Sequence, residues 1–70
     1  MSTIETTIVD TIFRNDSNQY SVIQVQSDGE TITVVGNFPE FFSGEQVVFS
    51  GNWDEHPLYG RQFKASGFKT

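Results

Sequence analysis

The 70-residue sequence contains no cysteine, only two prolines and only four lysine or arginine residues. The absence of cysteine excludes a disulfide framework and a thiolate metal site, and it fits a cytoplasmic protein. No run of residues approaches the ~20 apolar residues that span a membrane. The N-terminus also lacks the basic and then apolar pattern of a secretory signal. We therefore expect a cytoplasmic domain that makes no contact with a membrane.

The shortage of cations gives the chain a formal net charge of −5, because nine Asp and Glu residues outnumber the four Lys and Arg residues. An acidic surface repels the phosphates of nucleic acids at long range. Tight binding of nucleic acid by this chain alone is therefore not expected. The cations Arg14, Arg61, Lys64 and Lys69 could still outweigh the average charge if they gather on one face.

Aromatic residues, in contrast, are abundant: the chain has seven Phe, two Tyr and one Trp. Seventy residues make one domain at most, and a chain of this size buries only about 60% of its extended surface. Large rings supply the most buried area per residue. The sequence therefore predicts a small core built mainly from aromatic side chains.

Apolar and β-branched residues alternate with polar ones along most of the chain, whereas helical periodicity is nearly absent. We expect five strands, at residues 4–13, 20–26, 31–36, 47–53 and 61–68. The pair Asp28-Gly29 predicts a tight hairpin turn, since type I′ turns need a positive φ at both central positions. Gly51, in the middle of the fourth strand, indicates a bend, a bulge or a close approach of another backbone.

The segment 38–44 interrupts this pattern. Pro39 suits the first position of a helix and Gly44 suits the position after its end, so at most one short helical turn is expected here. Five antiparallel strands with a break between the third and the fourth predict an all-β fold, a small closed barrel with no free edges. The OB-fold fits best and an SH3-like barrel is the second choice. Many OB-folds carry a full helix at this break, for which the chain has no room.

Six short motifs, in this order and spacing, are similar to one known family. They are TIFRN at 11–15, YSV at 20–22, VVGN at 34–37, SGE at 43–45, GNW at 51–53 and EHPLYGRQF at 55–63. The chain resembles, over nearly its whole length, the N-terminal OB domain of RecD-like ATP-dependent DNA helicases, the family of the exodeoxyribonuclease V alpha subunit. The last motif is the most specific.

The resemblance implies that residues 1–70 are one OB domain from the N-terminal part of a much larger helicase that acts in DNA repair and recombination. ATP and magnesium are then expected only in that parent enzyme. The 70 residues contain no Gly-x-x-x-x-Gly-Lys-[Ser/Thr] phosphate loop, so this domain by itself is expected to have no cofactor and no catalytic activity. Its expected partners are the other domains of the parent enzyme and single-stranded DNA.

The candidate contact residues lie where OB-folds bind their ligands, on the face of strands two and three and in the loops joining strands one to two and four to five. In this chain those loops are residues 14–19 and 54–60. The candidates are Arg14, Tyr20, Tyr59, Arg61 and Lys64. Arg14 and Arg61 would flank one groove, with the two tyrosines as stacking partners. The alternative is structural: Arg61 would pair with Asp54 or Glu55, and Tyr59 would pack over the barrel end.

Three other aromatic or titratable features have simpler interpretations. Trp53 could stack on a base, but it shares the parity of Val47 and Phe49 and is interpreted as a core residue. One ring of the pair Phe41-Phe42 is expected to plug the barrel and the other to be exposed. His56 lacks the second His or Cys that a zinc site needs, so we interpret it as a structural residue and expect no metal site.

Three functional hypotheses remain open from the sequence. The first is an accessory domain that docks within a RecD-like helicase, with weak contact to single-stranded DNA at most. The second is an autonomous single-strand-binding module in which a local basic and aromatic groove outweighs the net charge. The third is a small β-barrel adaptor that binds a peptide by strand addition. The oligomeric state does not follow from the sequence.

Overall fold

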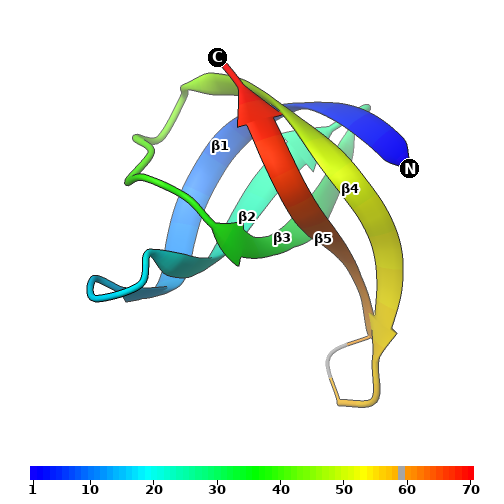
Figure 1. Ribbon diagram of the computed structural model, residues 1–70. Coiled ribbons are helices and arrows are strands. Elements are labelled where there is room, and N and C mark those ends of the chain that lie inside the picture. The colour runs from blue at the N-terminus through cyan, green and yellow to red at the C-terminus, as the bar shows by residue number, and fades with distance from the viewer. Residues whose placement is uncertain (59) are drawn as a thin grey trace.

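The computed structural model describes residues 1–58 and 60–70, which form five strands and no helix. The strands are β1 (Ser2–Asn15), β2 (Tyr20–Ser27), β3 (Glu30–Asn37), β4 (Gln46–His56) and β5 (Gly60–Lys69). They close into a barrel in the order β1-β2-β3-β5-β4, in which β1 also pairs with β4 (Figure 1). The expected all-β, OB-fold-like barrel is confirmed. The described residues include no helix of the length and apolarity needed to cross a membrane.

One strand pairing differs from the sequence-based expectation. All neighbours are antiparallel except β3 and β5, which run parallel through the pairs Val34↔Phe63 and Val35↔Lys64. The parallel pair arises because β4 crosses the barrel to pair with β1, so β5 returns beside β3 in the same direction. Closure therefore depends on a short contact between two strands that are far apart in the chain.

The segment between β3 and β4 contains a β-turn, so the short helical turn that Pro39 and Gly44 allow at residues 38–44 is not formed in the described structure. The amide of Glu45 donates to the carbonyl of Phe42 at 3.1 Å, and Gly44 has a φ of 91°. The other backbone groups bond outward: Ile8 donates to Glu45, Gly44 donates to Ile8, and Phe38 donates to Gln19. Bonds to β1 and to the β1–β2 loop thus replace the bonds that a helix would make with itself.

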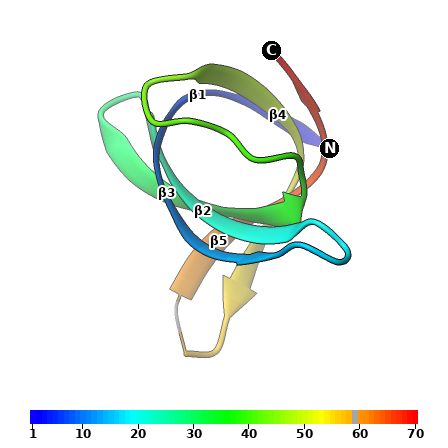
Figure 2. The same cartoon turned by 90° about the vertical axis from the view of Figure 1, so that its left-hand side faces the viewer.

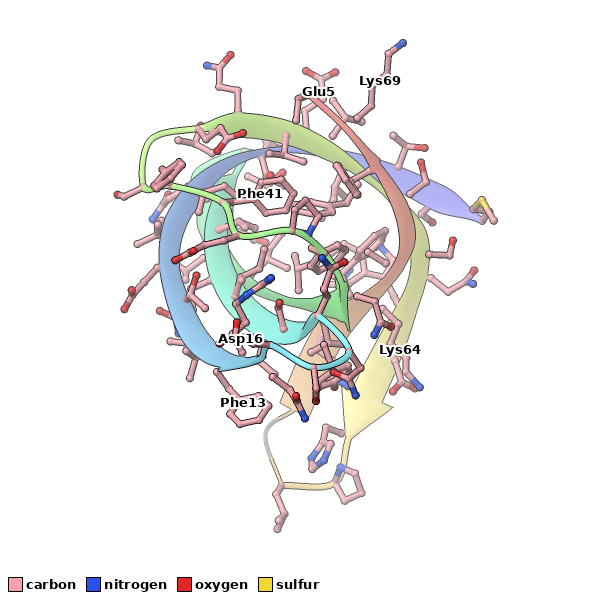
Figure 3. All side chains as sticks on the ribbon, turned by 60° about the vertical axis from the view of Figure 1, so that its left-hand side comes forward. Glu5, Phe13, Asp16, Phe41, Lys64 and Lys69 are labelled. Atoms are coloured by element: carbon pink, nitrogen blue, oxygen red, sulfur yellow. The ribbon has the colours of Figure 1, made fainter. Side chains whose placement is uncertain are left out.

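The core fills the barrel with the rings that the composition predicts. Its fully buried side chains include Phe38, Phe49 and Phe63, with Val25 and Val34 beside them. The 38–45 segment passes over one end of the barrel (Figure 2) and inserts Phe38 and Phe41 into it. Figure 3 shows Phe41 inside the ring of strands. Its neighbour Phe42 is 73% exposed, which confirms the expectation that one of these two rings is buried in the barrel and the other is exposed.

Two glycine-containing features also follow the sequence. Asp28 and Gly29 have φ values of 52° and 80°, which is the geometry of the expected hairpin turn. The register of β4 and β5 shifts between Ser50 and Gly51. A Cβ at position 51 would lie 2.8 Å from Ala65 Cα, which is too close for any side chain. Gly51 therefore marks both a bulge and a close approach of two backbones.

Candidate partner-binding face

Two irregularities in β1 create the candidate face. The register between β1 and β2 shifts between Ile8 and Asp10 and again between Thr11 and Phe13. Without these shifts Ile12 would share the face of Ile8, which is buried in the core. Instead, Ile12 is 55% exposed and Phe13 is 52% exposed. Bulges bend a strand and re-aim its side chains, and here they turn Ile12 to the outside of the barrel beside Phe13, which Figure 3 shows there.

Phe13 continues a row of apolar side chains across three strands. Phe13 lies opposite Val22 on β2, and Val22 lies opposite Val35 on β3. Cross-strand partners point to the same side of a sheet, so the three side chains form one strip. Ile12 and Tyr20 lie beside the strip and line the same groove, which encloses about 430 Å³.

The polar part of this groove carries hydrogen-bonding groups rather than full charges. Gln24 and Thr33 come from the next outward-facing pair of β2 and β3, and His56 and Gln62 come from the β4–β5 hairpin. Among the described residues that line the groove, none is Asp, Glu, Lys or Arg. The groove is therefore suited to an apolar segment with hydrogen-bonding groups, whereas it offers no fixed cation to a phosphate.

Of the five predicted contact residues, the four that the structure describes do not line one groove together. Tyr20 lines the groove, whereas Arg14, Arg61 and Lys64 do not. Tyr59 lies outside the described residues. Lys64 lies next to Val35 in the β3–β5 register, and its ammonium is 3.9 Å from the Asp54 carboxylate. The apolar groove is therefore distinct from the predicted contact surface between Arg14 and Arg61, which stays a prediction.

The Arg14 side chain bonds to other parts of the same barrel. Its guanidinium donates to the carbonyl of Phe38 at 2.6 Å and to the Ser21 hydroxyl at 3.3 Å, and it pairs with Asp16 at 3.0 Å. The side chain is 18% exposed, since it turns toward the segment that covers the barrel end. Arg14 therefore ties this segment to β2.

Replacing Arg14 with alanine is expected to lower stability without changing the groove. The change leaves the Phe38 carbonyl without its donor, and a lost hydrogen bond to a charged group costs about 1.5–3 kcal/mol. Urea unfolding would measure this loss. Asp16→Ala is the matched control, because Asp16 is exposed and its ion pair is worth at most about 1 kcal/mol. Equal losses for the two variants would contradict the role of the bond to Phe38.

Arg61 and Trp53 form a stack on the β4–β5 hairpin. The Cζ atom of Arg61 lies 3.9 Å from the centre of the Trp53 ring, and Trp53 meets Phe63 edge-on at 5.0 Å. Trp53 is partly buried and packs against the core, as its parity predicts. The expected ion pair of Arg61 with Asp54 or Glu55 is not found among the described residues. Arg61 lies over an aromatic ring instead.

No metal site is formed by the described residues, which contain no group of three His, Cys, Asp or Glu side chains placed to hold an ion. His56 Nδ1 accepts a hydrogen bond from the amide of Leu58 at 3.1 Å. This bond lies within the β4–β5 turn and fixes the local backbone. The structural interpretation of His56 is therefore supported.

The apolar strip of Phe13, Val22 and Val35 could not be predicted from sequence spacing alone. Phe13, Val22 and Val35 are ordinary strand residues in the sequence, and only the register of three strands places them side by side. The available signal was the sequence Ile12-Phe13, two large apolar residues in succession at the end of a strand. One of the two has to face outward in a regular strand.

A comparison with family models and one with solved structures give one match. The family model described as "ATP-dependent DNA helicase YrrC, OB-fold domain" matches residues 1–70, the whole chain. No solved structure matches the chain. The family match agrees with the barrel topology, because both lead to the OB-fold.

Proposed function

Because the chain belongs to the family of OB-fold domains of YrrC-type ATP-dependent DNA helicases, we propose that it is a non-catalytic docking module of a larger helicase. In this proposal the apolar groove binds another part of the helicase polypeptide. The observation that carries it is the composition of the groove, an apolar strip with neutral polar groups and no fixed charge among its described lining residues. ATP and magnesium would bind elsewhere in the parent enzyme.

The exposed area of the groove supports docking. Ile12 and Phe13 are more than half exposed, and Tyr20 lies beside them. Burying one such apolar side chain yields roughly 1.5–3 kcal/mol. A few side chains of this kind at the centre of an interface usually dominate its affinity. In a domain that had no partner, the same exposed apolar side chains would contribute little to stability.

Contact with single-stranded DNA is the second candidate function. Phe13 and Tyr20 have exposed rings on the face that OB-folds use for nucleic acids, and a stacked base is worth about 1–3 kcal/mol. The net charge of −5 opposes it. Of the cations, Arg14 is bound to Phe38 and Lys64 is paired with Asp54, so neither is available to a phosphate without breaking that contact.

Strand addition is less well supported. Each strand of the barrel has two neighbours, so none is left as an unpaired edge strand in the described part of the chain. A peptide that added a strand would have to open the β3–β5 contact first.

Docking can be tested by adding the remaining helicase polypeptide, expressed without this domain, to the ¹⁵N-labelled 70-residue chain. We expect NMR signals of Ile12, Phe13 and Tyr20 to shift or broaden. Phe13→Ala should weaken this binding by at least about tenfold, the loss expected for one buried ring. Phe42→Ala is the control, because Phe42 is equally large, exposed and outside the groove.

Binding of DNA is measured on the same chain. Labelled oligo-dT should show no micromolar affinity at physiological salt. Saturable micromolar binding that weakens steeply with salt would replace docking with single-strand binding. The docking proposal also fails if the helicase polypeptide leaves the groove signals unchanged or if Phe42→Ala weakens binding as much as Phe13→Ala.

A further inference from the structure

The Trp53–Arg61 stack forms a second surface, separate from the groove. The β4–β5 hairpin projects beyond the rest of the barrel (Figure 1). Glu55 lies opposite Arg61 and Trp53 lies opposite Phe63, so these four side chains alternate to the same side of the hairpin. None of the four lines the groove. The groove and this surface therefore have no lining residue in common.

Arg61 is held by the indole and has no ion pair among the described residues. The Cζ atom of its guanidinium lies 3.9 Å from the centre of the Trp53 ring, and the Phe63 ring meets Trp53 edge-on with the centroids 5.0 Å apart. The two ion pairs among the described residues belong to other cations, Arg14 and Lys64. Arg61 is exposed, and it lines a hollow together with Trp53. A guanidinium plane fixed in this way is a platform on which a flat ring can stack.

A carboxylate stands beside this platform. Trp53, Asp54, Glu55 and Arg61 line one hollow of about 270 Å³. Asp54 is already paired with Lys64, whereas Glu55 is exposed and has no ion pair in the described part of the chain. A ligand in the hollow would therefore meet a cationic plane and, at its edge, a carboxylate that accepts hydrogen bonds.

Among nucleobases this combination favours guanine. The Watson–Crick edge of guanine places two donors, N1–H and the N2 amino group, next to each other, so both can bond to one carboxylate. Adenine and cytosine place an acceptor nitrogen beside their amino group, and that nitrogen repels a carboxylate. Thymine and uracil offer a single N–H between two carbonyl oxygens. An unpaired base can present this edge because it has no complementary strand.

We propose that the hollow binds one unpaired guanine base, which stacks on Arg61 above Trp53 and donates two hydrogen bonds to Glu55. One stack and one pair of hydrogen bonds on an acidic domain give weak binding, with a dissociation constant on the order of 1 mM. The base can belong to a single strand or to a free guanine nucleotide. This site goes beyond the docking function and does not depend on it.

NMR on the ¹⁵N-labelled chain tests the site directly. We expect GMP to shift the signals of the Trp53 indole N–H and the Arg61 Nε–H in a saturable way. CMP and UMP should bind about tenfold more weakly, since they lack the paired donors. Ribose 5-phosphate, which has the phosphate but no base, should leave both signals in place. Equal shifts with all three nucleotides, or none with GMP, would overturn the proposal.

Variants separate stacking from base recognition. Arg61→Ala should abolish binding, and Glu55→Gln should reduce the affinity for GMP about tenfold with little effect on UMP. Lys69→Ala is the matched control, because it removes the same charge from the same strand at a residue that lines neither the hollow nor the stack. A loss with Lys69→Ala as large as with Arg61→Ala would mean that charge alone attracts the nucleotide, which contradicts the proposal.

The source of the base is distinguished by comparing GMP with a short oligo-dT that carries one central guanine. Tighter binding of the oligonucleotide identifies a single strand as the ligand, and tighter binding of GMP identifies the free nucleotide. Phe13→Ala should leave either affinity unchanged, because Phe13 lies in the groove and not in the hollow. If Phe13→Ala abolishes binding, the base binds the groove and the site proposed here is wrong.

Discussion

Replacing Gly51 with alanine is expected to destabilise the barrel by about 3 kcal/mol or more, the upper range for overpacking a well-packed interior. The new methyl group would meet the carbonyl oxygen of Lys64 and lie 2.8 Å from the Cα of Ala65. Both obstacles belong to the backbone of β5, so no side chain can rotate to make room. Relief would require β4 and β5 to move apart, which breaks hydrogen bonds on both sides of the bulge.

Urea unfolding followed by Trp53 fluorescence would measure this loss. Gly67→Ala is the matched control: Gly67 lies on β5 opposite Ser50, next to the same bulge, and a Cβ there meets nothing within 4 Å. That variant should stay within about 0.5 kcal/mol of the original chain. If the two alanines have similar effects, the loss comes from replacing glycine in a strand and not from the close approach of β4 and β5.

Replacing Phe38 with alanine should cost about 3–5 kcal/mol, the range for truncating a large buried ring. Phe38 is 1% exposed, and its ring lies 5.1 Å from that of Phe49 and 5.9 Å from that of Phe41. Because the 38–45 segment contains no helix, its position depends on this ring and on the bonds to β1 and the β1–β2 loop. A domain of this size has a total stability of only about 4–10 kcal/mol, so the variant should unfold at a markedly lower temperature than the original chain.

Thermal unfolding by circular dichroism checks this expectation. Phe42→Ala removes an identical ring from the same segment but from an exposed position, and it should leave the midpoint nearly unchanged. A small effect of Phe38→Ala would show that Phe41 and Phe68 collapse into the space, so that Phe38 does not hold the barrel end. Phe38→Leu, which keeps most of the volume, should recover part of the lost stability.

The fold was largely predictable because its signals are local. The turn at Asp28-Gly29 and the alternation in β2 and β3 each depend on residues that are adjacent in sequence. Gly51 in mid-strand indicated a bend, a bulge or a close approach, but its contact with Lys64 and Ala65 on β5 needed the fold. The 38–44 segment was not predictable in this way. Pro39 and Gly44 suit a helix, but the burial of Phe38 and Phe41 in the barrel and the bonds to Ile8 outweigh these preferences.

The candidate face was less predictable because it depends on strand register. The β-branched residues of β1 alternate without interruption, and nothing in them shows where the bulges near Val9 and Ile12 fall. Those bulges arise because one strand has to bend far enough to pair with both β2 and β4. Tyr20 could be predicted as a contact residue from its place at the start of a strand. The alignment of Phe13 with Val22 and Val35 could not be predicted, because it depends on the register of three strands in the closed barrel.

The two partners of β1 have a mechanical consequence. The first half of β1 pairs with β4 and its second half, with Phe13 near its end, pairs with β2. Tension applied at Phe13 would run lengthwise along β1 and load its row of backbone bonds together, rather than opening them one after another. A pull along β1 from this point would therefore have to break many bonds at once, whereas a pull at right angles to the strand would break them one by one.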